Sequence, residues 1–387
     1  MVGDPPKKRV ASIDVLRGAV MVLMAIDHVR VYSGVPAGGP TPGVFFTRWV
    51  THFCAPAFVF LAGTSAFLYR RGHDDLSRFL LTRGAWLVFL ELTVIRVAWT
   101  FNFDFAHYML AGVIWMIGWC MILMAGLVRL PVSVVGTIGL VIIAGHNAVG
   151  PAIVKFVNSS PDSALGALGK ILYVGFFAGP IALGIGDAKL TVLYSIVPWI
   201  GVMAAGYAFG TIVSFHSARR RGACLAIGFS AIALCLVLRG FNLYGDPRPW
   251  SGGLFSFLST TKYPASFSFL LMTLGPAIAL IPLLEGARGW LVRVLTVFGR
   301  VPFFFYVLHI PLIHALAILV SVARTGTANP WLFANHPMGN PEPPDGYVWS
   351  LGLLYFVWAV TIVNLYFACR WYSDFKARTN ARWVSYL

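Results

Sequence analysis

Long apolar stretches recur along the whole chain and are separated by short polar or glycine-rich segments. A helix needs about 20 mainly apolar residues to cross the hydrocarbon core of a bilayer. The pattern therefore predicts an all-α polytopic transmembrane bundle of about ten spans, forming a single domain over residues 1–387. The predicted helices lie at residues 12–33, 45–69, 78–100, 107–129, 131–149, 190–215, 222–240, 264–284, 294–322 and 347–370. Residues 166–189 are apolar but glycine-rich and broken by Pro180, which predicts a re-entrant or interfacial segment or an eleventh span.

The composition is that of a membrane protein. Of the 387 residues, 58% are hydrophobic and only 11% are charged, and the mean hydropathy is +0.77. A soluble protein of this length needs far more polar surface. The net charge of +15 comes from blocks between apolar runs, such as "RRGHDDLSR" and "ARRRG", so nucleic acid is not predicted as a partner. The five cysteines form no CxxC pair, which excludes a disulfide framework and a zinc motif.

The charged loops predict how the chain is oriented in the bilayer. Arginine and lysine collect in alternate loops, such as residues 70–78 and 219–221, whereas the opposite loops hold far fewer. Because basic loops stay on the cytoplasmic side, both termini are predicted to be cytoplasmic, with an even number of spans. The first apolar run is too long for a signal peptide, is charged inside and lacks a small-residue cleavage site, so it is predicted to remain as an uncleaved first span. The long loops at 241–263 and 323–346 then face outward, where an extracytoplasmic acceptor can be met.

The first predicted span, "SIDVLRGAVMVLMAIDHVRVY", carries ionisable residues inside an apolar segment. Arg17 and His28 are eleven residues apart, which places them within about 20° of one helix face and about 16 Å apart along the axis. Charged groups in a span are expensive and usually face the bundle interior or a water-filled path. One interpretation is a catalytic base with an arginine anchored on the same helix. The other is that these residues are interfacial anchors and mark the helix end.

Two further segments carry candidate residues. In "FTRWVTHFCAPAFVFLAGTSAF", Arg48 and His52 are four residues apart on one face of the second span, and they are expected to face the region of His28. In "FGRVPFFFYVLHIPLIH", His309 and His314 lie in the ninth span, five residues apart. That spacing is about 140° around the helix and does not suit a shared metal ion, so no metal site is predicted.

Three quoted segments, "RVASIDVLRGAVMVLMAIDH", "RWVTHFCAPAFVFLAGTSAFL" and "FGRVPFFFYVLHIPLIH", resemble the bacterial branch of the heparan-alpha-glucosaminide N-acetyltransferase-like membrane proteins, which are akin to the acyltransferase-3 superfamily. The most specific element is the Arg-x10-His spacing of Arg17 and His28. The resemblance implies a protein of the bacterial inner membrane. It also implies transfer of an acyl group, commonly acetyl, from cytoplasmic acyl-coenzyme A to a hydroxyl or amine, often of a sugar or glycan, on the far side. In the lysosomal members of the family, the histidine thought to act lies in the first outer loop. This sequence has no histidine between His28 and His52, so the lysosomal heparan substrate does not carry over.

Imidazole suits the deprotonation of an acceptor near neutral pH. The role of base falls to His28 or His52, with Arg17 and Arg48 in the catalytic group, and Asp27, Thr51 and His309 are expected to contact the acceptor. Donors to a developing oxyanion are expected from Arg48, Thr51 or the backbone near Gly63. Acyl-coenzyme A is expected as a co-substrate, with no bound cofactor, and direct transfer and an acyl-histidine both stay open. The phosphates of acyl-coenzyme A have four candidate partners: Arg70, Arg71, Arg78 and Arg83. The alternative is that these arginines act as topology determinants alone.

The alternative function is a membrane transporter or flippase for a small solute or a lipid-linked sugar. Histidines in the outer half of spans, broken helices and buried arginines are typical of transporters as well. The sequence shows no repeat of two halves, however, and Glu91 is the main carboxylate deep within a span. An acyltransferase is therefore the preferred prediction. The identity of the acceptor, the acyl chain length and the oligomeric state, including a homodimer, stay open.

Overall fold

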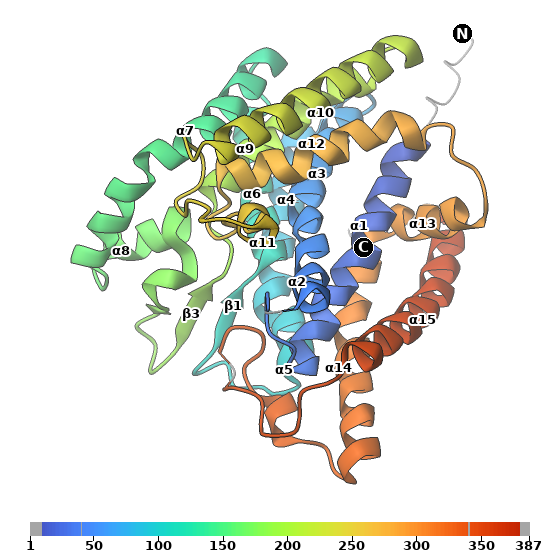
Figure 1. Ribbon diagram of the computed structural model, residues 1–387. Helices are drawn as coiled ribbons and strands as arrows, with labels where there is room; N and C mark the ends of the chain where they lie inside the picture. The colour runs from blue at the N-terminus through green and yellow to red at the C-terminus, as the bar shows by residue number, and fades with distance from the viewer. Residues whose placement is uncertain (1–9, 40, 340, 380–387) are drawn as a thin grey trace.

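The computed structural model describes residues 10–39, 41–339 and 341–379, and these form a mainly helical bundle (Figure 1). The two chain ends, predicted to be cytoplasmic, lie outside the described residues. The α-helices are α1 (Ala11–Ser33), α2 (Pro42–Trp49), α3 (Cys54–Arg70), α4 (Leu76–Leu90), α5 (Arg96–Thr100), α6 (Val113–Leu127), α7 (Val132–Ser159), α8 (Ala164–Gly169), α9 (Val197–Val213), α10 (Ser217–Gly240), α11 (Leu254–Leu258), α12 (Phe267–Leu284), α13 (Trp290–Arg300), α14 (Pro302–Thr325) and α15 (Leu351–Arg378). The shorter helical turns are Val50–Phe53, Glu91–Ile95, Lys170–Val174, Gly175–Ala178 and Pro330–Phe333.

Each of the ten predicted segments contains a helix, but the structure does not show ten membrane spans. Among the described residues, six helices are long and apolar enough to cross a bilayer: Pro42–Arg70, Val132–Ser159, Ser217–Gly240, Phe267–Leu284, Pro302–Thr325 and Leu351–Arg378. The helices α6 and α9 are apolar but only 15 and 17 residues long. The helix α1 and the helical segment 76–100 are longer, but they carry several ionisable residues, including Arg17, Asp27, Glu91 and Arg96.

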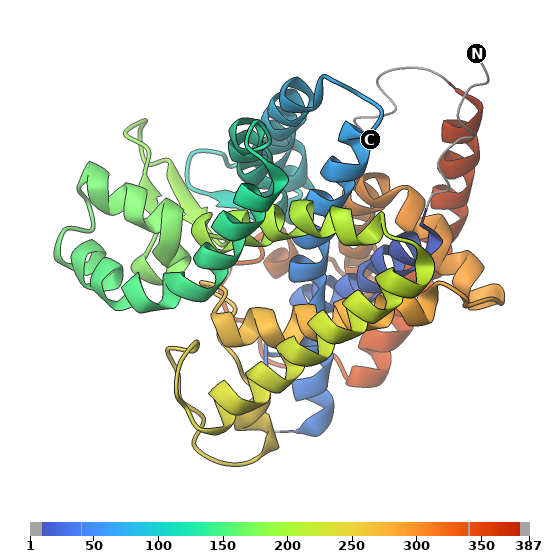
Figure 2. The same ribbon diagram turned by 90° about the horizontal axis from the view of Figure 1, so that it is seen from above.

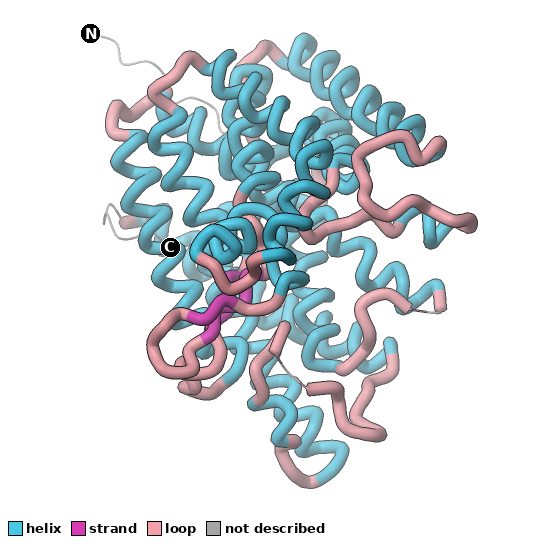
Figure 3. Tube along the Cα trace, turned by 90° about the vertical axis from the view of Figure 1, so that its left-hand side faces the viewer, coloured by secondary structure: helices cyan, strands magenta, loops and turns pink. Residues whose placement is uncertain are grey.

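The segment 166–189 does not form a membrane-length helix. The short helical turns of residues 164–178 are followed by β2 (Ile181–Ala182) and β3 (Lys189–Val192), which pair antiparallel. Strand β1 (Met109–Ala111) pairs parallel with β3, giving a small sheet of order β1-β3-β2 among the helices (Figure 3). The prediction of an all-α fold misses this sheet. Glycines at positive φ, Gly175, Gly179, Gly184 and Gly186, let the chain turn repeatedly where a helix would have continued.

The predicted ninth helix, 294–322, is two helices. α13 ends at Arg300 and α14 begins with Pro302 at its first position, where the missing N–H of proline is tolerated. The break turns α13 across α1, and the two backbones pack so closely that a Cβ on Gly18 would lie 1.9 Å from the carbonyl oxygen of Leu295. A Cβ on Gly299 would likewise lie 1.9 Å from the carbonyl oxygen of Asp14. The small residues therefore permit the crossing.

Helix α1 lies at the centre of the bundle, in contact with α3, α12, α13, α14 and α15 (Figures 1 and 2). One continuous hydrophobic core runs from Ile13 in α1 to Tyr372 in α15, and Met21, Ala25 and Val29 of α1 are fully buried within it. Since protein surrounds α1, its ionisable residues can find polar partners on neighbouring helices. This position explains how an apolar segment retains charged groups.

Candidate active site

His28 of α1 and His309 of α14 form a direct histidine pair. The distance from His28 Nδ1 to His309 Nε2 is 2.6 Å, and the two rings stack with centroids 4.8 Å apart. Trp99 meets the His28 ring edge-on at 4.9 Å. His309 is fully buried, whereas His28 keeps part of its surface exposed. The predicted candidates His28 and His309 therefore belong to one site, although 281 residues separate them in the chain.

The partners of His309 assign the protons of this pair. His309 Nδ1 lies 2.6 Å from the carbonyl oxygen of Tyr306 and 3.2 Å from that of Phe305, and carbonyl oxygens only accept hydrogen bonds. Nδ1 of His309 therefore carries the hydrogen, and its neutral ring accepts at Nε2. His28 Nδ1 then donates, and the lone pair of His28 lies on Nε2, where a general base needs it.

An ion cluster lies beside His28. The carboxylate of Asp27 accepts from Arg30 Nε at 2.9 Å and from Arg48 Nη1 at 2.8 Å, so two guanidinium groups surround one carboxylate. Arg48 Nη1 also donates to Thr51 Oγ1 at 3.0 Å. The structure thus brings together the predicted residues Asp27, Arg48 and Thr51. The cluster holds the end of α1 against α2, which carries Arg48, and it carries an excess of positive charge.

A cavity of about 30 Å³ opens beside these groups. Its lining includes His28, Asp27, Thr51 and two residues that the sequence analysis did not single out, Tyr194 and Lys262. Burial would raise the pKa of the nearby Tyr263 phenol, but the charges of Lys262 and Arg48 and a hydrogen bond with Tyr194 hold that pKa below its usual value. The cavity is therefore electropositive. We call it the His28 cavity.

A larger cavity of about 330 Å³ lies next to the His28 cavity and toward the start of α1. Both cavities share three lining residues, Met24, Phe58 and Val113. The walls of the larger one are mainly apolar, and its cationic residues are Arg17, Arg83 and Lys376. We call it the cationic cavity.

Arg17 lies in the cationic cavity and does not contact His28. Its guanidinium donates to Ser65 Oγ of α3 at 2.9 Å and to the carbonyl oxygen of Gly299 at 3.2 Å, and it lies 3.4 Å from Asp14 Oδ1. Arg17 therefore ties α1 to α3 and α13. Arg17 and His28, which are predicted to share one helix face, therefore line two neighbouring cavities: Arg17 the cationic cavity and His28 the His28 cavity.

The remaining predicted residues lie outside both cavities, apart from Arg83. His52 packs edge-on against Phe269 with ring centroids 5.5 Å apart, and its buried Nδ1 has no hydrogen-bond partner among the described residues. Arg70 donates to the carbonyl oxygen of Val128 and to the Tyr207 hydroxyl, and Arg71 donates to Ser214 Oγ. Arg78 is exposed and lines neither cavity. Of the four predicted phosphate partners, Arg83 lines the cationic cavity, and the other three line neither of the two cavities.

Sequence reasoning missed Lys262, Ser65 and Lys376. Ser65 belongs to the "AGTS" run, whose small side chains signal close packing as well as a site. Lys376 lies in a basic segment after the last predicted span, and such segments commonly set the topology of a membrane protein. Lys262 occurs in a polar loop with no motif around it. Its proximity to His28 becomes visible only in the folded chain.

Comparison with known families places these residues in context. The sequence model described as "Heparan-alpha-glucosaminide N-acetyltransferase, catalytic" matches residues 9–241, which include Arg17, His28 and Arg48 but not Lys262 or His309. No curated protein sequence matches the chain. The family match covers more than half of the 387 residues and agrees with the resemblance carried by the Arg-x10-His spacing. The chain therefore belongs to the family of the heparan-alpha-glucosaminide N-acetyltransferase catalytic domain, a family of membrane acetyltransferases.

Proposed function

We propose that this protein transfers an acyl group from cytoplasmic acyl-coenzyme A to a hydroxyl or amine of an extracytoplasmic sugar or glycan. Acetyl is the acyl group that we propose. The observation that carries this proposal is the pair of adjacent cavities. The cationic cavity and the His28 cavity meet at Met24, Phe58 and Val113. A donor on one side and an acceptor on the other can therefore approach the same point within the bundle.

The cationic cavity suits the acyl-coenzyme A donor. Arg17, Arg83 and Lys376 supply positive charge for the phosphates of the coenzyme, and the apolar walls suit the pantetheine arm and a short acyl chain. Of the four arginines predicted for this role, only Arg83 keeps it in this proposal. Arg70 and Arg71 are engaged with helix ends and hydroxyl groups elsewhere, and Arg78 is exposed away from the cavity.

His28 is the proposed base. Its Nε2 lone pair accepts the proton of the acceptor hydroxyl or amine, while its Nδ1–H stays hydrogen-bonded to His309. The positive charge that forms on His28 is shared with this neutral partner and lies near the carboxylate of Asp27. His52 has no place in the His28 cavity, which favours His28 for the role.

We further propose that four more helical segments cross the inner membrane, giving the ten predicted spans. The ionisable residues of α1 and of residues 76–100 largely face the interior of the protein. Glu91, for example, accepts hydrogen bonds from the backbone N–H groups of Gly112, Ile114 and Trp115. Helices α6 and α9 are short but strongly apolar. Loop charge supports cytoplasmic termini for this arrangement.

Acetyl-coenzyme A tests the proposed function directly. The detergent-purified protein is expected to gain thermal stability with acetyl-coenzyme A, and to move labelled acetyl groups onto members of a panel of amino sugars and neutral sugars. Dephospho-coenzyme A serves as the matched control, because it lacks one of the anionic groups that the cationic cavity is proposed to bind. Sugar uptake into proteoliposomes, without any response to acetyl-coenzyme A, would favour the transporter alternative and reject the acyltransferase.

A further inference from the structure

Acyl transfer needs a group that stabilises the oxyanion of the tetrahedral intermediate, and the three predicted donors are occupied in the structure. Arg48 is bound to Asp27 and Thr51. The Thr51 hydroxyl donates to the carbonyl oxygen of Arg48 at 2.7 Å. Gly63 lies in the interior of α3, where backbone N–H groups serve the helix, and it faces α9, since an added Cβ would be 2.0 Å from the carbonyl oxygen of Met203. Another group must fill this role if the proposed function holds.

Lys262 has the properties that the role requires. It is only 8% exposed and lines the His28 cavity. Among the described residues, its ammonium group has neither a hydrogen-bond acceptor nor a carboxylate within ion-pair distance. Its contacts are the rings of Tyr194 and Tyr263, with Nζ 5.6 Å and 5.2 Å from their centroids. Because burying an unpaired charge is costly, its position is best explained by an anion that forms in the cavity during the reaction.

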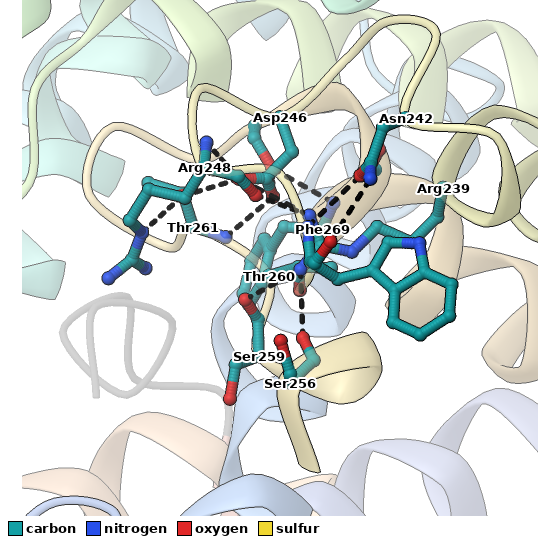
Figure 4. A network of polar contacts seen from close by, with 12 residues as sticks. Arg239, Asn242, Asp246, Arg248, Ser256, Ser259, Thr260, Thr261 and Phe269 are labelled. Atoms are coloured by element: carbon teal, nitrogen blue, oxygen red, sulfur yellow. Dashed lines mark hydrogen bonds and ion pairs between the residues drawn. The ribbon is translucent and has the colours of Figure 1, made fainter. Parts of the chain in front are cut away.

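The loop that carries Lys262 is held by a polar network (Figure 4). The carboxylate of Asp246 accepts from the backbone N–H and the hydroxyl of Thr261, both at 2.8 Å, and from the Ser266 hydroxyl at 2.9 Å. These two residues flank Lys262 in the chain. The network therefore fixes the backbone on both sides of the lysine.

Arg239, at the end of α10, completes the support of this loop. Its guanidinium donates to backbone carbonyl oxygens along the loop and lies 3.8 Å from Asp246 Oδ1. The four carbonyl groups belong to Arg248, Ser256, Phe257 and Ser259. A charge held rigidly in place before the reaction needs no reorganisation when the oxyanion forms, which is the condition for electrostatic catalysis.

We propose that Lys262 is the catalytic residue that stabilises the oxyanion, a role that rests on the proposed acyltransferase function. The acceptor heteroatom forms a bond to the thioester carbonyl carbon, and its proton passes to His28 Nε2. The π electron pair of the carbonyl moves onto oxygen, next to the Lys262 ammonium group. Re-formation of the C=O bond then breaks the C–S bond, and the coenzyme A thiolate takes the proton from His28.

Steady-state kinetics of three variants test this role. Lys262→Met and Lys262→Gln remove the charge, Lys262→Arg retains it, and Lys155→Met is the matched control, because Lys155 is exposed on α7. The assays follow acetyl-coenzyme A with glucosamine, and acetyl-coenzyme A hydrolysis, in which water replaces the sugar. Loss of the charge is expected to lower kcat roughly 10²–10³-fold in both assays with little change in either KM. Lys262→Arg is expected to recover part of that loss.

The outcomes separate this role from the proposed function. If the wild type is active and Lys262→Met keeps a near-normal kcat, the role of Lys262 is rejected while the proposed acyltransferase function stands. An increase confined to the KM for glucosamine would make Lys262 an acceptor-binding residue and also overturns the proposal. Loss of folded protein in both neutral variants would show a structural role and reject it. A wild type that neither binds acetyl-coenzyme A nor transfers acetyl groups rejects the proposed function and this role with it.

Discussion

His28 depends on its neighbours for the chemistry proposed here. The imidazole is suited to proton transfer by its nature, but the nitrogen that holds the lone pair is decided by His309, and His309 is in turn oriented by the carbonyl oxygens of Phe305 and Tyr306. Arg17 lies on the same helix but lines the cationic cavity, and it does not contact His28. At the scale of single residues, the site is a chain of hydrogen bonds that ends at His28 Nε2.

Replacing His28 by alanine removes the proposed base. We expect His28→Ala to stay folded and to lower acyl transfer roughly 10²-fold or more, the usual scale for the loss of a general base. His52→Ala is the matched comparison and is expected to have a smaller effect, since His52 lies against Phe269 and outside the His28 cavity. Single-turnover transfer at equal protein levels measures both. Normal turnover in His28→Ala with collapse in His52→Ala would move the base to the second segment.

His309 is expected to act by positioning His28. His309→Phe removes the acceptor for His28 Nδ1–H, and we expect kcat to fall by about 10-fold, less than the roughly 10²-fold or greater loss expected when the base itself is removed. The side-chain oxygen of His309→Gln offers a replacement acceptor and is expected to restore part of the activity. The kcat of each variant with acetyl-coenzyme A provides the test. Equal loss in both variants, with lower thermal stability, would indicate packing and not positioning.

At the scale of elements, close helix crossings place the site residues. The contact of α3 with α9 depends on Gly63 and Gly206, whose Cβ positions are occupied by the facing backbone. The crossing holds α3, which carries Phe58 between the two cavities and Ser65 beside Arg17. Packing at this crossing therefore helps to position two residues that line the cavities, Phe58 and Ser65.

A methyl group at Gly63 is expected to disturb the crossing. It would lie 2.0 Å from the carbonyl oxygen of Met203, so the helices must separate. We expect Gly63→Ala to destabilise the protein by about 1–3 kcal/mol, the usual cost of overpacking. Gly126→Ala is the control, because no atom lies within 4 Å of its added Cβ and helix propensity favours alanine. Thermal unfolding in one detergent measures both, and equal midpoints would show that the crossing relaxes freely.

At the scale of the whole molecule, the two cavities require a fixed orientation in the membrane. Arg17 contacts Gly299 before the start of α14, and His28 contacts His309 further along it, so α1 and α14 run in the same direction. Helix α3 runs the other way, with Thr51 near Asp27 and Ser65 near Arg17. The loop after α3 and the loop after α14 therefore lie at opposite ends of the bundle.

Loop charge predicts which end is cytoplasmic. We expect an impermeant maleimide to label Thr327→Cys in intact cells and to label Asp74→Cys only after the membrane is opened, because the basic loop near Arg70 stays inside. The five native cysteines are all buried, which keeps the background low. Labelling of Asp74→Cys in intact cells would reverse the orientation and place the cationic cavity outside.

Local features of the sequence determined most of the helices of this protein. Apolar stretches fold into helices in a bilayer because the backbone must satisfy its own hydrogen bonds there, and every predicted stretch contains a helix. The Arg-x10-His spacing and the neighbouring segments also pointed to the family, which the match over residues 9–241 confirms. The break at Pro302 and the sheet at residues 181–192 escaped prediction, because helical and turning conformations differ little in an apolar, glycine-rich stretch.

The site itself was decided by tertiary contacts. His28, Asp27, Arg48 and Thr51 lie close in the sequence, and their grouping was predicted in outline. His309 joins them from 281 residues away, and Lys262 arrives on a loop whose shape depends on Asp246 and Arg239. The sequence singles out His309 but not its contact with His28, and nothing local marks Lys262, because the direction of a side chain follows from how helices cross and how loops are held. Packing of the folded chain decides which of the histidines and cations lie at the two cavities.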